Sequence, residues 1–179
     1  MNMRMKNYLR RFRKEERGSV FVIEFVILVP ALFIPFFFGF EMSMHSIRQM
    51  QLDRALEITT REVRLFTGAE YTHDTIVKTI CANSGGLNDC EQNLRLEMVQ
   101  KDPRAYTPLE TRADCINSSE EVAPVRGWTL GEEHELMFMR ACYRYVPLWN
   151  KMGLGKELDK NDDGYGEMVS ISAFSQEPE

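Results

Sequence analysis

The sequence predicts an α+β protein: an N-terminal transmembrane helix continues into an amphipathic helical stalk, and a small antiparallel sheet domain stapled by disulfides follows. Three observations predict this. An almost uncharged run of about 20 residues is long enough to cross a bilayer. Apolar residues then recur at helical spacing, and in the C-terminal half three short stretches alternate between apolar and polar residues. The corresponding boundaries are 1–19 for a basic leader, 20–40 for the span, 41–68 for the amphipathic helix and 69–179 for the α+β domain.

Charge is distributed unevenly along the 179 residues. Residues 1–18 contain seven Lys or Arg against two Glu, a net charge of +5, so the total of −5 leaves −10 for the remainder. An acidic body argues against nucleic acid as its partner. The basic tip instead fits the rule that positive segments stay in the cytoplasm, which places everything after Glu41 across the membrane. The expected location is the bacterial inner membrane, with the N-terminus in the cytoplasm and the C-terminal domain in the periplasm.

The span, residues 20–40, is expected to be a permanent anchor. A cleavable secretory signal also begins with basic residues, but its apolar region is about 7–15 residues long and ends at a small-x-small site. Here the run is longer and leads into "EMSMHS", which fits such a site poorly. Pro30 and Pro35 lie within the span, and membrane helices tolerate proline, so we expect a shallow bend and not a break.

Behind the span, apolar residues recur every three or four positions with charged residues between them, which predicts an amphipathic helix ending near Gly68. The inward positions are Leu52, Ala55, Leu56, Thr59, Val63 and Phe66. If this helix is continuous with the span, it runs from about Val20 to Phe66 and measures on the order of 70 Å. The alternative is that its inward face packs on its own domain, and both statements can hold for one helix.

The pattern changes after the amphipathic helix. Asp74 is expected to cap a short helix from Thr75 to about Ala82. Three later stretches, "LRLEMV", "ELMFMRACYRYV" and "GEMVSISAF", are predicted to be strands of one antiparallel sheet. The segment between the first two strands carries three prolines, which exclude it from central strands. A surface loop tied down by Cys115 is expected there.

The four cysteines, Cys81, Cys90, Cys115 and Cys142, all follow the span and therefore lie on the side expected to be oxidising. They allow three pairings. Cys81 with Cys90 and Cys115 with Cys142 is favoured, because the first two flank "ANSGGLND", a turn-rich stretch that brings its ends together. Zinc is the competing interpretation, but the four lack C-x-x-C spacing and no histidine completes a ligand pattern.

One stretch, "DKNDDGYGE", matches the first half of an EF-hand calcium loop. Asp159, Asn161 and Asp163 stand at alternate positions before a glycine. The twelfth position is Ser170 and not the glutamate that binds calcium through both oxygens, and a strand pattern follows. A polar hairpin turn explains the same residues better, so calcium is only a weak candidate.

Motifs of catalysis are missing from the sequence. It contains no G-x-S-x-G, no H-E-x-x-H and no Gly-rich phosphate loop. His134, in "GEEHEL", fits a solvated face better than a proton-transfer site. We therefore expect neither an enzyme nor a cofactor.

Glu24 is the single charge within the span. A carboxylate inside a membrane costs at least a few kcal/mol and needs a partner. One explanation is that it snorkels to the nearby basic boundary. The other rests on a resemblance: a basic segment, Gly18, Ser19 and then "VFVIEF" resemble the leader of type IV pilin-like proteins, which a dedicated aspartyl prepilin peptidase cuts on the cytoplasmic side. The resemblance implies that Glu24 offsets the N-terminal ammonium of a neighbouring subunit.

The resemblance also suggests where the leader ends. Counting from Gly18 makes Glu24 the sixth residue of the mature chain, whereas counting from Ser19 makes it the fifth, which is the position found in the family. The expected cleavage is therefore after Ser19, which leaves Val20 as the first residue. Glu24 and Phe25 then form the Glu-Phe pair of the family.

The longer opening, "RKEERGSVFVIEFVILVPALFIPFFFGFEM" with "RQMQLDRALEITTREVRLF" behind it, is similar to the TadE-like branch of the Tad (tight adherence, Flp pilus) system. "ACYRYVPLW" and "SAFSQEP" resemble the C-terminal part of such proteins. TadE, TadF and TadG share the leader, so the resemblance identifies the group and not the member.

The resemblance implies a minor pseudopilin-like assembly protein of a Tad secretion system, which builds the Flp type IVb pilus. Its implied partners are the Flp pilin, TadF/TadG-like pseudopilins, the inner-membrane platform and the prepilin peptidase. The alternative is a signal-anchored periplasmic binding or sensor domain whose leader is never cut.

Overall fold

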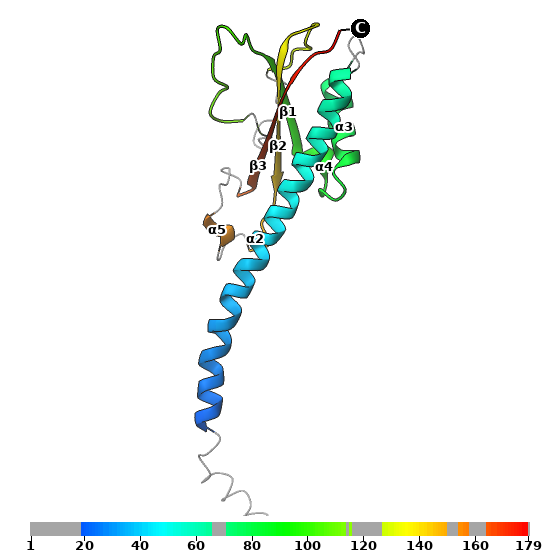
Figure 1. The fold of residues 1–179 in the computed structure, drawn as a ribbon. Coiled ribbons are helices and arrows are strands. Elements are labelled where there is room, and N and C mark those ends of the chain that lie inside the picture. Colours follow the sequence, from blue (N-terminus) through cyan, green and yellow to red (C-terminus); the bar gives the residue numbers. More distant parts are fainter. Residues whose placement is uncertain are drawn as a thin grey trace, which may run out of the picture. The chain divides into compact units, whose positions relative to one another are not determined.

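The structure, a computed structural model, describes residues 19–65, 71–113, 115, 127–149, 154–157 and 164–178. The chain divides into two compact units, Met1–Phe40 and Glu41–Glu179, and each is described by itself. The elements in chain order are α2 (Ser19–Leu65), α3 (His73–Asn83), α4 (Cys90–Asn93), β1 (Leu94–Gln100), β2 (Leu136–Tyr145), α5 (Leu154–Glu157) and β3 (Gly166–Ser175), as labelled in Figure 1. The long apolar helix, the three-stranded antiparallel sheet and two disulfides confirm the α+β class.

The described part of the first unit is helical throughout. α2 passes Pro30 and Pro35 without ending, as expected for an apolar segment. From residue 21 to residue 40 every side chain is exposed except Val29, which is half-buried, so nothing in the described part of the chain covers this surface. Among the described residues this is the one helix long and apolar enough to cross a membrane, and a signal sequence would meet the same criterion.

The second unit contains the rest of α2, which is amphipathic as predicted. Four of its apolar side chains belong to the core, Leu52, Ala55, Leu56 and Val63, and Thr59 and Thr60 are buried beside them. Its apolar stripe packs on its own domain, which was one of the two interpretations of this helix. The extended stalk stays a prediction.

The sheet has the strand order β1-β2-β3, and both neighbouring pairs are antiparallel. The predicted strands are confirmed, each to within one residue at either end. On one face of the sheet, alternate strand residues contribute side chains to the core, which also contains side chains of α2 and α3. The two helices therefore cover the same face of the sheet (Figure 1). From the strands these core residues are Leu94, Leu96, Met98, Met137, Met139, Ala141, Tyr143, Tyr145, Met168 and Phe174.

The expectation that Asp74 caps the short helix is wrong. α3 begins at His73 and its N-cap is Thr72, whose hydroxyl accepts a hydrogen bond from the Thr75 N–H at 3.3 Å. Thr72 occupies the cap because its oxygen reaches the third N–H of the helix, which has no partner inside the helix. Asp74 then lies in the first turn, where a negative charge still favours the helix dipole.

The connection between β1 and β2 is described for residues 101–113, 115 and 127–135. It contains no helix or strand there apart from one isolated bridge between Met98 and Trp128. Most of its side chains are exposed, and Cys115 is bonded to β2. For these residues the predicted surface loop is confirmed.

Candidate functional site

The predicted processing site lies at the start of α2. Ser19 is the first residue of the helix and Val20 the second, so the bond between them lies in its first turn. Gly18 lies outside the described residues. Helix ends fray, and a peptide bond in a first turn becomes available to a protease far more easily than one in a helix interior.

Glu24 lies just over one turn into the same helix. Its side chain is exposed, and so are its neighbours on the helix surface, Phe21 (73%), Phe25 (59%) and Leu28 (50%). Within the described residues, no hydrogen bond or ion pair involves its carboxylate. If the helix lies in a membrane, a partner for this charge has to come from a residue outside the described part of the chain or from another molecule.

The two disulfides join the pairs that the sequence favoured. Cys81 of α3 is bonded to Cys90 of α4 with 5.6 Å between their Cα atoms, and Cys115 is bonded to Cys142 of β2 with 5.3 Å. The first bond closes the turn between two short helices. The second attaches the long connection to the central strand.

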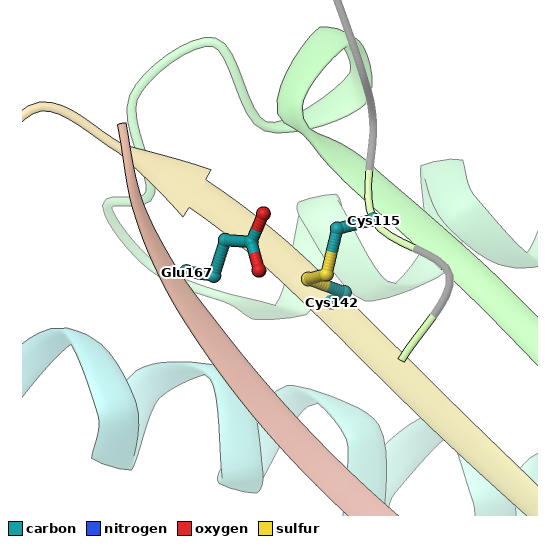
Figure 2. Close-up of side chains that lie close together, drawn as sticks. All are labelled: Cys115, Cys142 and Glu167. Atoms are coloured by element: carbon teal, nitrogen blue, oxygen red, sulfur yellow. A yellow bond between two sulfur atoms is a disulfide. The ribbon is translucent and has the colours of Figure 1, made fainter. Parts of the chain in front are cut away.

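Glu167 of β3 lies beside the second disulfide, and Figure 2 shows the three side chains together. One carboxylate oxygen and the sulfurs of Cys115 and Cys142 are all within 4.8 Å of one another. Zinc binds thiolates, and these two sulfurs are instead bonded to each other. The calcium candidates Asp159, Asn161 and Asp163 lie outside the described residues.

Arg140 is buried on the sheet face opposite the helices. Its guanidinium pairs with the Glu97 carboxylate on β1 and donates hydrogen bonds to the backbone carbonyls of Glu110 at 2.6 Å and of Arg112 at 3.2 Å. One charged side chain thus holds the connection against the sheet, two residues along β2 from Cys142. We call this arrangement the Arg140 clasp, and its role is structural, because each of the three guanidinium nitrogens bonds an acceptor within the protein.

A polar cluster forms at the start of the second unit. Glu41 is only 4% exposed, and its Oε1 accepts a hydrogen bond from the Trp149 N–H at 3.3 Å, while its Oε2 has no hydrogen-bond partner among the residues that the structure describes. One turn further along α2, His45 Nδ1 lies 2.8 Å from the Tyr145 hydroxyl. The Arg48 guanidinium lies 5.3 Å from the centre of the Tyr145 ring.

The electrostatics of this cluster act on Tyr145. Burial raises the pKa of its hydroxyl above the ordinary value, Arg48 opposes this, and the negative charge of Glu41 adds to it. Sequence reasoning missed the cluster. Two features of the sequence could have indicated it: Glu41 directly follows the apolar run, and the segment "YRYVPLW" begins and ends with aromatic residues.

β3 forms one edge of the sheet. Gln49 of α2 donates a hydrogen bond to the Val169 carbonyl at 3.1 Å, and no other described residue bonds the outer edge of the strand. Residues 168–175 carry no charge, and Val169 and Ile171 are exposed. Edge strands usually carry charges or proline that prevent pairing with another chain. Residues 168–175 lack both, so this part of the edge, beyond Glu167, suits a partner strand.

Comparisons with known proteins return nothing: no protein-family model, no curated protein and no solved structure matches the chain. What bears on function is therefore the residues and their geometry. The two acidic positions at the apolar helix, Glu24 and Glu41, are the most informative of these.

Arg140→Met tests the clasp. The substitution keeps the bulk of the side chain but removes the guanidinium from Glu97 and from two backbone carbonyls, so the free energy of unfolding should fall by about 2–5 kcal/mol. Denaturant unfolding of the detergent-solubilised full chain measures this. The control is the double variant Arg140→Met with Glu97→Met, which buries no charge at the pair and should recover part of the loss. A loss below about 0.5 kcal/mol for the single variant would contradict the assignment.

Tyr145→Phe tests the polar cluster through its pH dependence. Below pH 10 the hydroxyl should stabilise the wild type by about 0.5–1.5 kcal/mol through its bond with His45. Because the pKa is raised in the folded state, this advantage is present below the ordinary value of 10.0 and is lost as pH rises through the folded value. Unfolding measured from pH 8 to 11 should show the two proteins converging. Other tyrosines are common to both, so a constant difference would refute the burial of this phenol.

Proposed function

We propose that the chain is a minor pseudopilin-like assembly protein of a Tad secretion system, which builds the Flp type IVb pilus. Residues 20–40 anchor it in the bacterial inner membrane, and a prepilin peptidase removes the leader. The observation that carries the proposal is Glu24. It is an exposed carboxylate within residues 20–40 of α2, which are otherwise uncharged, and it has no bonded partner among the described residues. A charge placed there is costly unless another group pairs with it.

Cleavage after Ser19 would supply such a group. It would turn the Val20 nitrogen from an amide into an ammonium at the end of the helix. Residues four apart lie on the same side of a helix, about 6 Å apart along the axis. The ammonium of the same chain and that of a neighbouring chain packed alongside are therefore both within reach of Glu24. Either pairing makes the carboxylate tolerable in lipid only after the leader is gone, so processing and assembly become coupled.

The second unit supports a role in assembly through its surface. The outer edge of β3 is uncharged from residue 168 to residue 175 and can accept a strand from another protein, and the sheet face beside it exposes Val169 and Ile171. The partners that we propose are the Flp pilin, TadF/TadG-like pseudopilins and the inner-membrane platform. None of these roles needs a catalytic residue or a cofactor in this chain.

N-terminal sequencing tests the processing step. Protein extracted from membranes of cells with the prepilin peptidase should begin at Val20, and protein from cells lacking the peptidase should begin at Met1. The physical reason is that the expected bond lies at the first turn of α2, next to the basic leader. Intact Met1 in both strains would refute the proposal and leave an anchored periplasmic binding or sensor domain.

Glu24→Gln tests the assembly step separately. The variant keeps the size of the side chain and removes the charge, so it should insert in the membrane at least as well as the wild type. Its recovery in cross-linked complexes with pilus proteins should fall about tenfold or more, the equivalent of losing about 1.4 kcal/mol of pairing. Glu24→Asp, which keeps the charge, is the matched control and should retain most of the complex. Equal recovery of all three proteins would show that the carboxylate has no role in assembly.

A further inference from the structure

The segment after β2 exposes two large aliphatic side chains that are two positions apart in sequence. Val146 is 57% exposed and Leu148 is 58% exposed, whereas Pro147 between them is buried. Tyr145 precedes the pair and Trp149 follows it. The segment 146–149, which we name the VPLW loop, therefore presents two exposed aliphatic side chains; the residue before it, Tyr145, is buried, and its last residue, Trp149, is half-buried.

The VPLW loop is attached to the first residues of the second unit. The Trp149 N–H donates to Glu41 Oε1 at 3.3 Å, and Glu41 is almost completely buried. Gly155 of α5 packs against the same contact: a Cβ atom there would lie 2.6 Å from Glu41 Oε1 and 2.4 Å from the Trp149 carbonyl oxygen. At the other end of the loop, Tyr145 contacts His45. The loop is thus held at both ends.

These contacts determine how far the loop can lie from the apolar run. Glu41 directly follows residues 20–40 in sequence. If those residues span a membrane, Glu41 lies at the boundary between lipid and water. A four-residue loop bonded to its carboxylate cannot reach more than roughly 10–15 Å from that boundary, at about 3.5 Å per residue. This limit holds whatever the orientation of the second unit.

We propose that the VPLW loop is a membrane-interface anchor. The loop contacts the phospholipid leaflet on the side where residues 20–40 end. Val146 and Leu148 lie in the region between the headgroups and the acyl chains. Trp149, whose side chain is half-buried, lies at headgroup level, where such rings are enriched. Arg48, stacked on Tyr145, adds a positive charge that suits anionic headgroups. The inference rests on the membrane anchoring in the proposed function, but not on leader cleavage or on pilus partners.

The anchor restrains the second unit. A chain held only by its span has a single attachment to the membrane. With a second contact the domain is attached at two places, so the surfaces that it offers, such as the β3 edge, keep a constant height above the membrane. That restraint suits a protein that has to meet partners in the same membrane.

Tryptophan quenching tests the proposal on the full chain. The protein has two tryptophans, Trp128 and Trp149, so the difference between the wild type and Trp149→Phe reports Trp149. Phe keeps the backbone N–H that bonds Glu41. The chain is reconstituted in vesicles of phosphatidylcholine and phosphatidylglycerol that contain lipid brominated at a shallow acyl position. Trp149 should be quenched about twofold or more strongly than Trp128, as expected for a ring at the interface.

A second variant distinguishes membrane contact by the VPLW loop from membrane anchoring by residues 20–40. Val146→Ser with Leu148→Ser removes the aliphatic tip, so Trp149 quenching by brominated lipid should fall and quenching by aqueous iodide should rise. Flotation of the chain with vesicles should not change, because residues 20–40 are intact. The readout does not depend on which way the chain inserts, since the loop stays with the end of the span.

Two other outcomes are distinguishable. Wild-type chain that floats with vesicles but shows Trp149 open to iodide and unaffected by brominated lipid would overturn the anchor, and it would leave a protein partner as the occupant of the loop. Chain that does not float with vesicles would overturn the membrane anchoring of the proposed function, and the loop anchor with it.

Discussion

The packing of one stripe of α2 against the sheet is the contact on which the second unit depends. Leu52 and Leu56 are almost fully buried against strand residues such as Leu96 and Met139. No other helix of comparable length is described in this unit, and α3 and α4 add only a few buried side chains. A domain of this size buries a limited apolar area, so loss of the stripe would leave one sheet face uncovered. The position of the three strands therefore follows from the helix that also carries the apolar run.

The opposite sheet face is held by other means. It has a disulfide and a buried ion pair, where the helix face has apolar packing. Arg140 uses its guanidinium to satisfy backbone carbonyls of a connection that has no regular structure of its own in its described part, while Cys142 fixes the same connection covalently. These restraints cover β1 and β2. β3 lies at the edge of the sheet, and Val169 and Ile171 are exposed there.

Two glutamates at the apolar helix illustrate opposite ways to place a carboxylate near a membrane. Glu24 is exposed within the apolar segment and lacks a bonded partner among the described residues, so in a membrane its charge would need a partner from the rest of the chain or from another molecule. Glu41 is buried at the end of that segment, and one of its oxygens holds the backbone of a distant loop. The first suits a group that forms an intermolecular pair. The second suits a joint that fixes part of the domain beside the membrane.

The sequence by itself determined the features that depend on local chemistry. The length and composition of the apolar run predict a long helix, period-two alternation predicts three strands to within a residue, and a turn-rich stretch predicts the bond between Cys81 and Cys90. Only the tertiary structure decided that Arg140 pairs with Glu97 and that Glu41 contacts Trp149. The last pair is 108 residues apart in the chain. Such contacts leave no local periodicity, because their partners become neighbours only after the helix and the sheet have packed.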